Sequence, residues 1–172
     1  MRYLETLREF DGKHVEPLQE IVVSGEADDG ALHEMLMLSD HDEPGVTTAA
    51  TWVVKQWADR GRGFTREQVR ELQRLLKVDA PWEAQLHLLQ ILSRKDILLA
   101  PTKKLEKTLL GLVDSSNKFV QAWNLSVLAK LAEQTPALRE PCVAALAAAE
   151  SGGTAAVRAR VRKVRKSHDW AN

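Results

Sequence analysis

The sequence contains only one cysteine in 172 residues, Cys142. A single cysteine excludes an intramolecular disulfide and a metal site built from several thiolates. Its surroundings, "PCVAALAAAE", are apolar. We therefore expect the Cys142 thiol to be a small core residue and not a nucleophile.

Long hydrophobic runs are also missing. The longest is "CVAALAAA", which is far shorter than the ~20 apolar residues that a membrane-spanning helix needs. The opening "MRYLETLREFDGK" has no apolar stretch of signal-peptide type. The sequence therefore predicts no membrane association and a location in a reducing cytoplasm.

Strand signals are lacking too, because no Asn-Gly or Asp-Gly turn separates two alternating apolar runs. Apolar residues instead recur every three or four positions, in about nine stretches of roughly 10 to 17 residues that predict helices with short connections. Gly61 predicts a helix end, and Thr65 with Gln68 predicts a capping box. Ser115 or Ser116 is expected to cap a later helix. Pro141 predicts a helix that either kinks or starts late.

Similar helical segments recur along the chain. An offset of 39 residues aligns "LHLLQIL" (86–92) with "LSVLAKL" (125–131), and an offset of 35 aligns Val53, Val54 and Trp57 with Leu88, Leu89 and Leu92. An offset of 36 aligns the valines of 157–164 with 121–128. A second helix is expected between these segments, at 65–77, 101–113 and 136–149. Helix pairs are therefore predicted every 35 to 39 residues.

The segment "VDSSNKFVQAWNLSVLAKL" resembles the HEAT-repeat family and the related armadillo-like solenoids through Asp114, Val120, Ala122, Leu125 and Leu128. It departs from that family's pattern in having Gln where an Arg often follows the valine. The resemblance implies an all-α, right-handed α-solenoid of about four antiparallel helix pairs in one domain. A generic helical bundle is the alternative. Within residues 1–172, we expect acidic cap helices over 1–43, HEAT-like repeats over 44–166 and a tail over 167–172.

Charge is unevenly distributed although 24 basic and 24 acidic residues balance. No Lys or Arg lies between Lys13 and Lys55, a span with nine acidic residues, whereas "VRARVRKVRK" (157–166) carries six cations. Val157, Val161 and Val164 fall on one helical face, which predicts a buried stripe. The oppositely charged ends permit head-to-tail self-association.

Cations with helical spacing form a candidate basic surface. Two rows occupy the predicted second helices and would meet in one groove if those helices lined a concave face, and a third row lies on the last helix. The candidate residues are Arg66, Arg70, Arg74, Lys103, Lys107, Arg158, Arg162 and Arg165. Their functional interpretation is contact with phosphates, and the alternative is a solvated outer face.

No motif indicates catalysis, a cofactor or a metal. The acidic loop "SDHDEPG" lacks metal-ligand spacing, and we expect its acids and Pro44 to begin the next helix. Trp82 and Trp123 are expected to pack in the core. We predict a non-enzymatic protein-interaction scaffold or adaptor. The alternative is a nucleic-acid-binding repeat protein, and a weaker one is an enzyme of the DNA-alkylation-repair kind, which resembles this chain only at the level of fold.

Overall fold

The computed structural model describes residues 1–26 and 28–172, and within these residues the chain is helical, with no strand. Ten α-helices are present in this part of the chain. They are α1 (Leu4–Arg8), α2 (Glu16–Gly25), α3 (Asp29–Leu38), α4 (Pro44–Asp59), α5 (Arg66–Leu75), α6 (Trp82–Leu92), α7 (Lys103–Gly111), α8 (Lys118–Gln134), α9 (Arg139–Gly152) and α10 (Ala155–Ser167). Two short 3₁₀ helices, η1 (Pro136–Leu138) and η2 (Asp169–Ala171), complete the described secondary structure.

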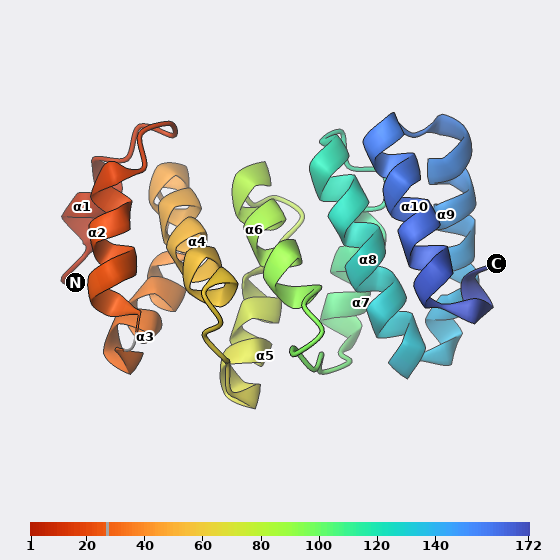
Figure 1. Ribbon diagram of the computed structural model, residues 1–172, viewed down its shortest axis with the longest axis horizontal. Coiled ribbons are helices and arrows are strands. Elements are labelled where there is room, and N and C mark those ends of the chain that lie inside the picture. The colour runs from red at the N-terminus through yellow and green to blue at the C-terminus, as the bar shows by residue number, and fades with distance from the viewer. Residues whose placement is uncertain (27) are drawn as a thin grey trace.

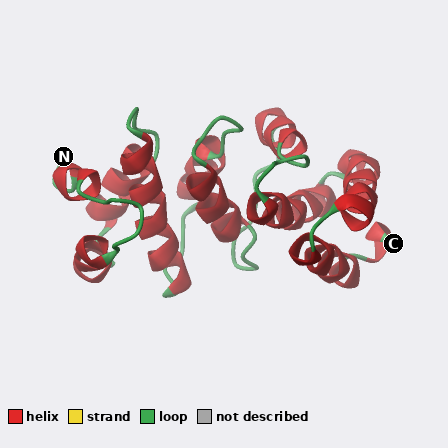
Figure 2. Cartoon of the chain, turned by 90° about the horizontal axis from the view of Figure 1, so that it is seen from above, coloured by secondary structure: helices red, strands yellow, loops and turns green. Residues whose placement is uncertain are grey.

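The helices form an elongated array of two layers (Figure 1). Helices α2, α4, α6, α8 and α10 stand side by side in chain order, and each packs against the next; we call them the front row. Helices α3, α5, α7 and α9 lie behind that row in Figure 1. The view from above shows the two termini at opposite ends of the array (Figure 2). The helical prediction is thereby confirmed.

Local signals in the sequence set several helix ends. Gly61 has a φ of 96°, and the amide of Arg62 donates to the carbonyl of Trp57 over 3.0 Å, so the glycine closes α4 as predicted. The Thr65–Gln68 capping box begins α5. The predicted serine cap is wrong, because the Asn117 side chain accepts from two amides at the start of α8. Its carboxamide oxygen reaches those amides as a serine hydroxyl would.

Pro141 lies in the first turn of α9, which begins late, after η1. A proline is tolerated there because the amides of a first turn have no intrahelical acceptor. The described part of the chain has one helix more than the nine or so that the sequence predicts. The additional helix is α1, which packs on α2 and α4. No helix in the described residues is both long and apolar enough to cross a membrane.

The core runs along the interface of the two layers. Buried apolar side chains from Tyr3 to Ala171 belong to one hydrophobic cluster. The valine stripe of α10 is buried as predicted, since Val157, Val161 and Val164 expose at most 4% of their surface. Trp57 is fully buried in α4. Stacking apolar stripes in this way buries surface that no single helix pair could hide.

Successive front-row helices are also joined at their C-terminal ends. The last carbonyls of a helix lack intrahelical donors and carry partial negative charge. Side chains from the following part of the array donate to them, at sequence separations of 35, 36, 36 and 38 residues. The pairs are Trp57–Val22, Arg62–Glu26, Arg94–Ala58 and Lys130–Leu92. These separations match the spacing at which similar helical segments recur in the sequence.

Candidate binding groove

A groove of about 610 Å³ crosses the front row from α4 to α10. Six cationic side chains line it, contributed by α4, the loop after α6, α8 and α10. They are Lys55, Arg94, Lys95, Lys130, Arg160 and Lys163. Asp59 is the one carboxylate among the lining residues. We call this feature the basic groove, and its charge suits an anionic ligand.

The groove cations differ in how they are paired. Lys55 forms an ion pair with Asp59, and Arg94 binds Asp96 through two bonds of 3.0 Å. Lys95, Arg160 and Lys163 make no ion pair with any of the described residues. Within the same part of the chain, Lys130 also makes no ion pair and donates only to carbonyls. Four cations with no carboxylate partner in one hollow therefore leave a local excess of positive charge that a ligand can neutralise.

Arg94 and Lys130 are positioned by helix C-termini. The Lys130 Nζ donates to the carbonyls of Leu92 and Arg94 over 2.8 and 2.6 Å, and Arg94 donates to the carbonyl of Ala58. Burial lowers the pKa of Lys130 to about 8. The ammonium therefore remains largely protonated at neutral pH, with one N–H left for a ligand after its two carbonyl bonds.

Arg160 lies over an aromatic ring. Its Cζ is 3.8 Å from the centroid of the Trp123 ring, which is cation–π distance. Both side chains are partly buried. Burial lowers the pKa of Arg160, but a guanidinium remains charged throughout the physiological range. The predicted core role of Trp123 is only half right, because it packs against the core and also lines the groove.

Helix α10 turns one particular side toward the groove. Arg160, Lys163, Val164 and Ser167 line it, a spacing that forms one helical face. The predicted cations of α10, which are Arg158, Arg162 and Arg165, are not among the lining residues. Arg158 donates to the carbonyl of Gly153, and Arg165 pairs with Glu150 over 2.6 Å.

The other predicted rows lie in the back layer, on α5 and α7. None of Arg66, Arg70, Arg74, Lys103 and Lys107 lines the basic groove, although all five are exposed. Arg74 is held by Glu71 at 2.7 Å and by Asp40 at 2.9 Å, and Lys103 pairs with Glu106. The groove therefore belongs to the first helix of each predicted pair and not to the second.

None of the six groove cations is among the candidates predicted from the sequence. Arg160 and Lys163 belong to the basic stretch 157–166, but Lys55, Arg94, Lys95 and Lys130 lie outside every predicted row. A weak signal exists, since Arg94, Lys130 and Lys166 follow each other at intervals of 36 residues. That interval lies within the predicted repeat spacing. A search for basic residues that recur at the repeat interval would have found the first two.

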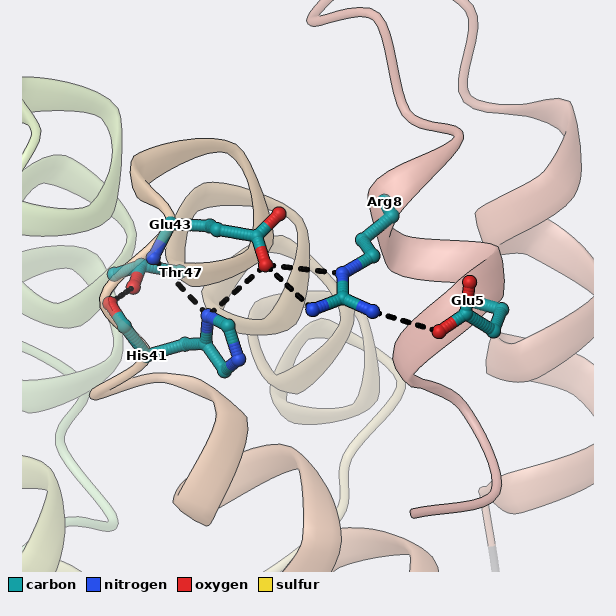
Figure 3. Close-up of polar contacts among 5 residues, drawn as sticks. All are labelled: Glu5, Arg8, His41, Glu43 and Thr47. Atoms are coloured by element: carbon teal, nitrogen blue, oxygen red, sulfur yellow. Dashed lines mark hydrogen bonds and ion pairs between the residues drawn. The ribbon is translucent and has the colours of Figure 1, made fainter.

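The acidic loop before α4 holds no metal-ligand arrangement. The described residues contain no cluster of three or more His, Cys, Asp or Glu side chains suited to a metal. Glu43 accepts from Arg8 over 2.7 and 3.0 Å, and Arg8 also donates to Glu5 (Figure 3). Pro44 occupies the first turn of α4 as predicted, but the Glu43 carboxylate forms this bridge to α1 and makes no cap bond.

Two further sequence interpretations are resolved by burial. Cys142 is fully buried, which raises the pKa of its thiol to about 11 and leaves it a core residue, as predicted. Next to this core, His87 is partly buried and lies 3.1 Å from the Thr51 hydroxyl. Burial lowers the pKa of His87 to about 4. Trp82 is 44% exposed, so its predicted place in the core is wrong.

No protein-family model matches this sequence, and comparisons with curated proteins and with solved structures find no similar chain.

Proposed function

We propose that this protein is a non-enzymatic interaction module of the HEAT-like solenoid kind, which holds an anionic segment of a partner protein in the basic groove. The observation that carries the proposal is the lining of the groove, where six cations face one carboxylate. Such a surface steers an acidic partner toward itself and disfavours a basic one.

The dimensions of the groove suit an extended peptide. Neighbouring packed helices lie about 8–10 Å apart, so the path from α4 to α10 covers about 24–30 Å. An extended chain rises about 3.3 Å per residue and needs about eight or nine residues to cross it. Helices α4, α8 and α10 each contribute at least one cation to that path, and the loop after α6 contributes Arg94 and Lys95.

A fluorescein-labelled Glu-rich peptide of about nine residues provides the test. We expect binding that weakens as salt rises and that falls about tenfold or more in the variant Lys95→Glu/Lys163→Glu. The matched control is Arg66→Glu/Arg70→Glu, which changes net charge equally in the back layer. Equal losses in both variants, or no binding by the unaltered protein, would contradict the proposal.

Nucleic acid is the second candidate ligand, favoured by further cations on α10. Arg158, Arg162 and Lys166 are exposed on the helix that supplies Arg160 and Lys163 to the groove. A phosphate backbone would be bound with a steep salt dependence. The test measures binding of a labelled single-stranded oligonucleotide to the unaltered protein and to the same two variants. Tighter binding of the oligonucleotide than of the acidic peptide would favour nucleic acid as the ligand.

A further inference from the structure

The α8–α10 end of the basic groove brings Arg160, Lys163 and Lys130 together, and none of the three forms an ion pair among the described residues. Arg160 makes neither an ion pair nor a side-chain hydrogen bond with the described residues, and its one specific contact is the Trp123 ring. This cation–π contact holds the guanidinium over the ring, and its N–H donors have no acceptor among the described residues. The arginine is thus positioned before a ligand arrives, which lowers the entropy lost on binding.

Other donors line the same end of the groove. Lys163 is exposed and unpaired among the described residues, and Lys130 is partly buried with one N–H unused by its two carbonyl bonds. Ser126 also lines this hollow, as does Ser167, whose hydroxyl donates to the carbonyl of Lys163 over 3.0 Å. Three cations and the Ser126 side chain are therefore available around one space.

From this arrangement we propose that the α8–α10 end of the groove is a phosphate subsite, which takes a phosphorylated residue of the partner protein. A phosphoryl group carries nearly two negative charges and three acceptor oxygens at neutral pH. Arg160 can bind two of those oxygens, while Lys163 and Lys130 balance the second charge. A carboxylate carries one charge and two oxygens, so a single arginine would satisfy it. The inference rests on the proposed function and specifies its ligand.

The pH dependence of binding distinguishes the two ligand groups. A phosphoserine gains its second charge near pH 6, so its affinity rises between about pH 5 and 7. A glutamate is already ionised over that range, so its charge and the affinity of its peptide stay nearly constant. Above pH 8, Lys130 loses its proton because burial lowers its pKa to about 8, and affinity for either ligand falls.

The test compares two labelled acidic peptides that differ at one central position, phosphoserine or glutamate. We expect the phosphopeptide to bind about tenfold more tightly at pH 7, with the pH profile above. Arg160→Lys keeps the charge but loses the planar fork, so it should abolish the preference. Arg158→Lys, outside the groove, should retain it, and circular dichroism checks that both variants fold.

The outcomes separate the two proposals. Equal affinity for both peptides, or a preference that survives in Arg160→Lys, overturns the phosphate subsite and leaves the proposed function standing. Failure of both peptides to bind overturns the proposed function as well. Tighter binding of a single-stranded oligonucleotide than of the phosphopeptide overturns the assignment to a phosphorylated protein and favours nucleic acid.

Discussion

In the N-terminal third of the chain, acidic side chains pair with cations that come from distant positions. In the groove, by contrast, four cations on α8, α10 and the loop after α6 have no acidic partner among the described residues. Five of the nine acids between Lys13 and Lys55 form ion pairs. The pairs are Glu26–Arg60, Asp28–Arg2, Asp29–Arg62, Asp40–Arg74 and Glu43–Arg8.

This contrast changes the meaning of the uneven charge in the sequence. The acidic end is partly neutralised by cations of its own chain, which lowers the charge that it would offer to a second copy in head-to-tail association. The positive charge of the groove is not neutralised in the same way. Paired charges join helices, and unpaired charges remain available to a ligand.

The largest expected effect is a loss of stability in the acidic N-terminal part of the array, caused by substitution of a buried tryptophan in α4. Trp57→Ala removes a fully buried ring whose Nε1 donates to the carbonyl of Val22 over 2.9 Å. We expect a loss of about 4 kcal/mol in the free energy of unfolding. Urea denaturation measures it, with Trp82→Ala as a control whose exposed ring should cost less than about 1 kcal/mol. Similar losses in the two variants would show that the buried ring does not join α2 to α4.

A smaller effect is expected at the boundary between the two regions, where His87 of α6 meets Thr51 of α4. Burial lowers the pKa of His87 to about 4, whereas the unfolded chain takes up that proton near pH 6.5. The unfolded state therefore binds more protons between these values, and stability falls as pH drops from about 6.5 to 4. We expect His87 to account for about 3 kcal/mol of that fall.

Denaturation of the unaltered protein and of His87→Leu at several pH values isolates this contribution, because the carboxylates titrate alike in both. The variant should lose less stability over the same range. An identical slope in the two proteins would mean that His87 is solvated in the folded state.

The smallest expected effect compares the contribution of a paired cation to stability with that of an unpaired groove cation. Arg74→Met removes a paired cation, and we expect it to cost about 0.5 kcal/mol because the pairs with Glu71 and Asp40 are partly exposed. Lys163→Met removes an unpaired cation. It should leave the free energy of unfolding unchanged or slightly raised and should lower the affinity for the acidic peptide. Thermal unfolding at low and high salt measures both. If Lys163→Met is the more destabilising variant, the groove cations have a structural role.

Much of the fold was predictable because its causes are local. The Thr65–Gln68 box, the turn at Gly61 and the valines of α10 each depend on residues within one or two helical turns. Errors arose where several local solutions compete, as when Asn117 and not a nearby serine caps α8. The candidate site was predicted less well, since the rows on α5 and α7 satisfied helical spacing but lie in the other layer.

The sequence by itself determined that the chain is helical, where most helices begin and end, and which face of each is apolar, because hydrogen bonding and periodic burial act over short distances. Only the tertiary structure decided which cations share a surface. Arg94 and Lys130 enter the groove because the carbonyl ends of helices about 36 residues earlier accept their hydrogen bonds. Such contacts depend on how the layers stack, and no single segment encodes them.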